Sequence, residues 1–117
     1  MKRRMILTNF NLPRWAGLCK YSIKRQVFLL NGKELKGEQG HPTVNDHLIT
    51  EQNAVISISN IELIDNVAYG LVQALDKPGK EEIQAQLERD CHLSIRASIA
   101  APFGKDELVN IVTWDLV

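Results

Sequence analysis

Candidate metal-ligating side chains are few and lie in two short segments. His41, Asp46 and His47 fall within one polar stretch, and Cys91 and His92 are adjacent. Imidazole, thiolate and carboxylate groups all bind zinc, so a zinc site drawn from these segments is one interpretation. Structural zinc sites usually show paired ligands such as CxxC or HxxxH, and the chain has neither pair. The favoured prediction is therefore that these histidines are solvated and that no metal is bound.

Nucleophilic catalysis has no better support. A cysteine nucleophile needs a histidine base within hydrogen-bond reach, and neighbours on a helix, such as Cys91 and His92, point about 100° apart. Cys19 lies among apolar residues and is interpreted as part of the core. The adjacent carboxylates at 81–82 and 106–107 fit a helix start and a solvated turn. The chain also lacks GxSxG, GxxxxGK[ST], GxGxxG and HExxH. We predict a protein that is not an enzyme and needs no cofactor.

The formal net charge of zero hides a division of charge along the chain. Residues 1–40 carry nine Lys or Arg against two acidic residues, a net charge of +7. Residues 41–117 carry five Lys or Arg against twelve acidic residues, a net charge of −7. Unless the two halves fold against each other, one face is basic and another acidic, and each attracts partners of the opposite charge.

Aromatic residues are interleaved with the basic residues of the first half. Cations that neutralise phosphates beside rings that stack on bases are typical of single-stranded nucleic-acid binding. Alternation places Tyr21 opposite the lysines and predicts that it lies in the core. A solvated strand face with edge-protecting lysines explains the pattern equally, and the pI of about 6.8 is low for a nucleic-acid domain. Nucleic-acid binding is thus the alternative function, with the candidate residues Lys20, Lys24, Lys33, Lys36, Trp15 and Phe28.

The acidic second half supplies the favoured function. Small immunity proteins and inhibitors cover a basic active site or nucleic-acid-binding site with acidic groups, which also steer a fast encounter. By analogy with that class, the chain is predicted to be a small non-enzymatic binding protein, acting on a macromolecular partner as an inhibitor or immunity-type protein. A solvated acidic face is the simpler explanation of the same pattern. The candidate partner-binding residues are Glu81, Glu82, Glu88 and Asp90.

Length and composition indicate a single globular domain over residues 1–117. With 44% hydrophobic and 24% charged residues, such a chain can build a core without disulfides. No apolar run approaches the roughly 20 residues of a membrane span. The apolar stretch after Arg4 is also shorter than the roughly 7–15 residues of a secretory signal. We expect a cytoplasmic protein with no membrane partner and with two free thiols, Cys19 and Cys91.

Alternating apolar and polar residues predict most of the strands. The longest alternation covers residues 19–30 and is followed by Asn31-Gly32, the strongest signal for a two-residue hairpin turn. A return strand over 33–36 would complete a basic hairpin over residues 19–36. The final strand, residues 108–116, is apolar on both faces and is placed centrally in the sheet. The other predicted strands cover residues 5–10, 54–59 and 93–99.

Two helices are predicted in the second half. Residues 80–91 carry an apolar stripe and begin with two glutamates, which favour the positive end of a helix. Residues 61–75 show helical spacing of apolar residues, with Ser59 and Glu62 in the positions of a capping box. A strand pair turning at Asp65-Asn66 is the alternative for this segment. With 61–75 helical, the prediction is an α+β fold, a mostly antiparallel sheet with two helices packed on one face.

Overall fold

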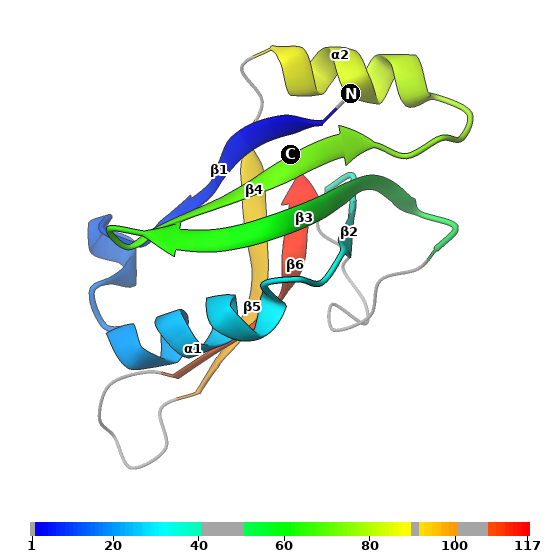
Figure 1. Cartoon of the computed structure of the whole chain (residues 1–117). Coiled ribbons are helices and arrows are strands. Elements are labelled where there is room, and N and C mark those ends of the chain that lie inside the picture. Colours follow the sequence, from blue (N-terminus) through cyan, green and yellow to red (C-terminus); the bar gives the residue numbers. More distant parts are fainter. Residues whose placement is uncertain (1, 41–50, 90–91, 101–107) are drawn as a thin grey trace.

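The computed structural model describes residues 2–40, 51–89, 92–100 and 108–117 (Figure 1). These residues form six strands and two α-helices, and the strands pair antiparallel, which confirms the predicted α+β class. The elements are β1 (Arg3–Asn9), the 3-10 turn η1 (Pro13–Trp15), α1 (Lys20–Leu30), β2 (Leu35–Glu38), β3 (Ala54–Ile64), β4 (Val67–Ala74), α2 (Lys80–Glu88), β5 (Leu93–Ala100) and β6 (Leu108–Leu116).

The strands form two layers with one core between them. β1, β4, β3 and β2 make, in that order, a four-stranded sheet, and β5 and β6 make a two-stranded ribbon. In Figure 1 the ribbon runs behind the sheet and across its strands, while α1 and α2 lie at opposite ends. Both helices and the ribbon contribute to the same buried cluster, so they cover one face of the sheet. Its buried residues include Ile23, Val27, Ile56, Ile58, Ile83, Leu87, Trp114 and Leu116.

The predicted hairpin over residues 19–36 is wrong, because residues 20–30 form α1. Its buried apolar residues, Ile23, Val27 and Leu30, recur at helical spacing. The neighbouring polar residues on that side bond the backbone of β6: Ser22 Oγ accepts from Val109 N–H at 2.9 Å, and Gln26 Oε1 accepts from Ile111 N–H at 3.0 Å. Packing against β6 therefore stabilises a helix here, although the alternation of apolar and polar residues predicts a strand.

Asn31-Gly32 ends this helix instead of turning a hairpin. Gly32 has a φ of 86°, and the N–H of Lys33 donates to the carbonyl of Leu30 at 3.0 Å. Glycine at positive φ closes helices as readily as it forms two-residue hairpin turns. The same two residues thus serve both structures, and only the flanking packing distinguishes them.

The helix predicted over 61–75 is also wrong, and the strand pair is right. β3 and β4 form a hairpin whose turn residues Asp65 and Asn66 have φ of 50° and 62°, as a type I′ turn requires. The pairing of β3 with β4 shifts between Ser59 and Glu62, where Asn60 has a φ of 52°. This bulge moves Ile61 onto the core face and interrupts the alternation of β3, which leaves a spacing that imitates a helix.

The other predicted elements are present with bounds shifted by a few residues. β6 pairs with β5 at the rear of the molecule, and its end approaches β2 through a parallel bridge between Gln39 and Leu116. The prediction that β6 is central in the sheet is therefore wrong, because β6 belongs to the two-stranded ribbon and lies where the two layers meet. Among the described residues, no helix is long and apolar enough to cross a membrane.

β2 and β6 lie close enough to exclude a side chain at one position. A Cβ atom on Gly37 would overlap the backbone oxygen of Trp114 and press on Ile56. We predict that Gly37→Ala lowers the free energy of unfolding by about 1–3 kcal/mol, the usual cost of overpacking. Urea denaturation measures this value. Gly40→Ala is the control in open space, where the cost comes only from its φ of 74°. Equal stability of the Gly37 variant and wild type would contradict the close approach.

Candidate functional site

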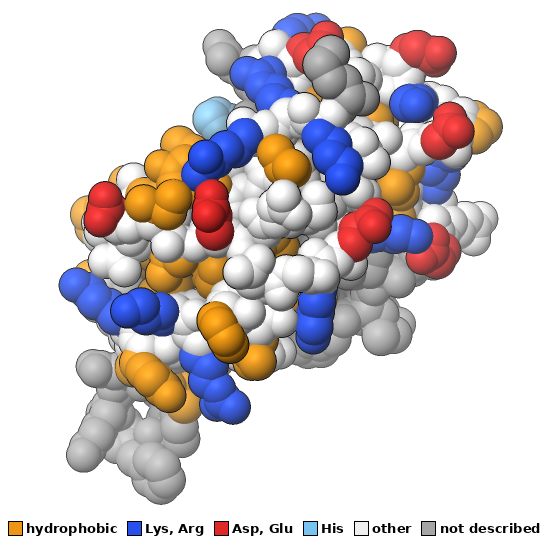
Figure 2. All heavy atoms as spheres, viewed as in Figure 1, with side chains coloured by type: hydrophobic (Ala, Val, Ile, Leu, Met, Phe, Trp, Pro, Cys, Tyr) orange, Lys and Arg blue, Asp and Glu red, His pale blue; other side chains and the backbone are white. Residues whose placement is uncertain are grey.

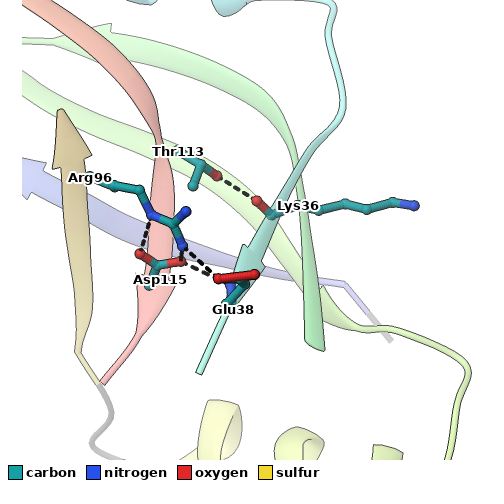
Figure 3. Close-up of polar contacts among 5 residues, drawn as sticks. All are labelled: Lys36, Glu38, Arg96, Thr113 and Asp115. Atoms are coloured by element: carbon teal, nitrogen blue, oxygen red, sulfur yellow. Dashed lines mark hydrogen bonds and ion pairs between the residues drawn. The ribbon is translucent and has the colours of Figure 1, made fainter. Parts of the chain in front are cut away.

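A buried ion network joins the two layers where β2, β5 and β6 meet (Figure 3). The guanidinium of Arg96 donates from Nε to Asp115 Oδ2 at 2.8 Å and from Nη2 to Asp115 Oδ1 at 2.6 Å. The same Nη2 also donates to Glu38 Oε1 at 3.2 Å. Asp115 Oδ1 in turn accepts from the backbone N–H of Glu38 at 2.9 Å. All three residues are buried, so this cluster is a cross-link between strands.

Electrostatics favours the charged form of Arg96 in this cross-link. The side-chain hydrogen bond to Asp115 raises the pKa of Arg96 above its usual value, against the opposing effect of burial. The guanidinium therefore stays protonated wherever the protein is folded. Nearby, Thr113 Oγ1 donates to the backbone carbonyl of Lys36 at 2.7 Å and adds a second tie between β6 and β2.

Most residues considered for metal binding or nucleophilic catalysis lie outside the described residues. These are His41, Asp46, His47, Cys91 and residues 106–107. Cys19 is a free, half-buried thiol that immediately precedes α1. His92 is exposed at the start of β5. Within the described part of the chain, no group of three or more His, Cys, Asp or Glu residues could hold a metal ion.

The predicted acidic surface lies on α2. Glu81, Glu82 and Glu88 are exposed there, and Glu88 accepts a hydrogen bond from Gln84 at 3.4 Å. Asp90 falls outside the described residues. The large hydrophobic residues of α2, Ile83 and Leu87, are both buried. The acidic surface thus offers charge without an exposed apolar anchor.

The predicted basic residues are divided by the structure. Lys20 and Lys24 are exposed on α1, and Lys33 is exposed just after it. Lys36 lies on β2 and pairs with Glu51 at 2.7 Å. Trp15 is half-buried in η1, with the Arg14 guanidinium 4.7 Å from its ring centroid. Only Lys20, Lys24 and Phe28 share one element.

The outer side of α1 exposes two aromatic rings. Tyr21 is 74% exposed and Phe28 is 75% exposed, so the predicted core position of Tyr21 is wrong. Helical spacing explains this, because Tyr21, Lys24, Arg25 and Phe28 stand at i, i+3, i+4 and i+7 on one side. Figure 2 shows basic and hydrophobic side chains next to one another over α1. Arg25 is exposed on the same side of the helix and is therefore part of this surface.

We call Lys20, Tyr21, Lys24, Arg25 and Phe28 the α1 surface. The sequence of α1 contains no acidic residue, and its first turn carries a lysine where the helix dipole favours an anion. A shallow hollow of about 220 Å³ lies beside Phe28, between α1 and the bulged part of β3. Glu62, at the rim of this hollow, is paired with Arg4 at 2.7 Å. The α1 surface therefore combines exposed rings with an excess of positive charge.

A larger groove lies between β1 and β5, the outer strands of the two layers. Its volume is about 580 Å³, and β1, η1 and the start of β5 line it. Its lining includes four arginines, one histidine and Trp15, and among the described residues that line it none is acidic. No local pattern in the sequence indicates this groove, because its walls come from residues 3–15 and from residues 89 and 92–95, which only the fold brings together.

Comparisons with known proteins give no assignment for these surfaces. No protein-family model, no curated protein and no solved structure matches the chain. The chemistry of the α1 surface and of the groove is therefore what bears on function.

Proposed function

We propose that the protein is a non-enzymatic binding protein whose macromolecular partner is single-stranded nucleic acid, held by the α1 surface. The observation that carries this proposal is the exposure of Tyr21 and Phe28, at 74% and 75%, among three cations on a helix without acidic residues. Exposed rings provide stacking platforms for bases, and lysine and arginine neutralise the phosphates between them. At 1.5 Å per residue, the two rings are about 10 Å apart along the helix axis.

The order of residues on the helix favours nucleic acid over a protein groove. A helix that docks into an apolar groove presents apolar anchors at i, i+3 or i+4, and i+7. Here the intermediate positions are Lys24 and Arg25, so charges separate the two rings. Placing both cations in an apolar groove would cost their desolvation. A strand that alternates phosphates with bases meets both kinds of side chain.

The acidic surface of α2 supports the inhibitor function less well. Binding energy at protein interfaces concentrates in aromatic and arginine anchors that fill pockets of the partner. The exposed side of α2 offers carboxylates around Ala85 and no aromatic residue. An acidic-surface inhibitor remains the competing hypothesis, and it predicts that different charges matter.

Salt dependence of binding separates the two hypotheses. If the three cations of α1 contact phosphates, affinity for a labelled single strand of about 16 nucleotides should fall with salt, with a log–log slope of about −2. Lys20→Ala and Lys24→Ala should each make this slope shallower by about 0.7. Fluorescence anisotropy measures the affinity between about 50 and 200 mM salt.

Lys36→Ala is the matched control, because Lys36 carries the same charge but pairs with Glu51 on β2. It should leave affinity and slope unchanged. If Lys36→Ala acts like Lys24→Ala, binding is non-specific attraction to net charge and the α1 surface is not the site. If no single strand binds and Glu81→Lys instead slows association with a basic protein, the inhibitor hypothesis replaces this proposal.

A further inference from the structure

The groove between β1 and β5 has the composition of an anion-binding site. Arg3, Arg4, Arg14, Arg89 and His92 line it, and none of the other lining residues that the structure describes carries a carboxylate. Like charges gathered in one groove repel one another, and an anion placed among them removes that cost. The geometry therefore favours a negatively charged occupant.

The arginines of the groove differ in how far the protein occupies their donors. Arg4 is the most engaged, since it pairs with Glu62 at 2.7 Å and lies 4.8 Å from the Tyr69 ring centroid. Arg3 donates from Nη1 to the carbonyl of Leu87, and Arg89 donates from Nε to the carbonyl of Ala85. Since a guanidinium has five N–H donors, these bonds leave Arg3 and Arg89 further donors for a ligand.

Arg14 and Trp15 form the wall of the groove at η1. The Arg14 guanidinium stacks on the indole, and Phe10 meets the indole edge-on with ring centroids 5.7 Å apart. Leu12 and Met5 extend this apolar wall. The groove thus places an aromatic and apolar surface directly beside its cations.

We propose that this groove binds a nucleoside phosphate, with Arg14, Arg89 and His92 at the phosphate and Trp15 beside the base. Arginine forks bind the paired oxygens of phosphate and carboxylate groups alike, but a phosphate offers three acceptor oxygens and more negative charge to several cations at once. A volume of about 580 Å³ suits a small organic ligand better than a bare ion. The nucleoside phosphate is either a free nucleotide or a nucleotide unit of a strand. This inference uses none of the residues of the α1 surface.

The test is a titration of the full chain with ATP, adenosine, inorganic phosphate and the single strand used above, followed through the indole N–H signal of Trp15 by NMR. Trp15→Phe assigns that signal, because Trp114 supplies the other indole. We expect saturable binding of ATP that is at least tenfold tighter than binding of adenosine or phosphate. The double variant Arg14→Gln/Arg89→Gln should weaken it at least tenfold. Lys36→Gln, on β2 and outside both the groove and the α1 surface, should leave it unchanged.

Each result decides for or against the proposal. Equal affinity for ATP and inorganic phosphate would overturn it, because the groove would then be a site for simple anions. Absence of saturation by either ATP or the strand would overturn it as well. If only the strand moves the Trp15 signal, and the groove variant abolishes this effect, the nucleotide unit of a strand is the ligand and the proposal stands. Lys20→Ala/Lys24→Ala shows separately whether the α1 surface binds, so the two proposals fail independently.

Discussion

Replacing Arg96 by methionine should lower the free energy of unfolding by about 3–5 kcal/mol, because it leaves two buried carboxylates without their cationic partner. Asp115 is fully buried and Glu38 nearly so, and Arg96 bonds both of them. Methionine fills part of the volume but supplies no charge. Since small domains are stable by only about 5–15 kcal/mol, this single change removes a large share of the total.

Arg4→Met is the matched control for this experiment. Arg4 makes an ion pair of similar length with Glu62, but both side chains are about half exposed. Exposed pairs contribute about 0–1 kcal/mol, so this variant should differ little from wild type. Urea denaturation of both variants gives the comparison. If Arg96→Met costs no more than Arg4→Met, the network does not hold β2 to β6.

The double variant Tyr21→Ala/Phe28→Ala should abolish most of the affinity for single strands while leaving stability unchanged. Stacking of one base on an aromatic residue contributes about 1–3 kcal/mol, so two rings correspond to a loss of at least about 30-fold. Because both side chains are about three-quarters exposed, their removal opens no cavity in the core. The rings carry no charge, so the salt slope should keep its wild-type value while the affinity falls.

Ile64→Ala controls for the loss of exposed apolar surface. Ile64 is 45% exposed at the end of β3, outside the α1 surface. It should not change strand affinity measured by anisotropy. A double ring variant that binds as well as wild type would show that the exposure of Tyr21 and Phe28 serves something other than stacking.

The predictions from sequence succeed where one periodicity dominates. The strand of β5 and the helix of α2 each have one apolar side, and both are found close to the predicted residues. Residues 19–30 fit the periodicities of a strand and of a helix in part, because Ile23 and Val27 lie on the apolar side in both. The contacts of Ser22 and Gln26 with β6 favour the helix, and they join residues more than 80 positions apart. No pattern within residues 19–30 indicates such long-range contacts.

Only part of the α1 surface was predicted from the sequence, because the helix itself was not predicted. Lys20, Lys24 and Phe28 were identified from their chemistry, which does not depend on the element that carries them. Tyr21 was assigned to the core because a strand places neighbours on opposite faces, whereas a helix places Tyr21 and Lys24 on one side. Lys36 was included because the predicted hairpin would have placed it on the strand paired with residues 19–30, and β2 instead pairs with β3.

NMR chemical-shift mapping shows directly whether the α1 surface contacts a single strand. The full chain, labelled with ¹⁵N, is titrated with the same single strand, and backbone amide shifts are followed for each assigned residue. We expect the largest shifts to cluster from Lys20 to Asn31, with α2 unaffected over Lys80–Glu88. Largest shifts on α2, or a spectrum that the strand leaves unchanged, would contradict a nucleic-acid-binding role for the α1 surface.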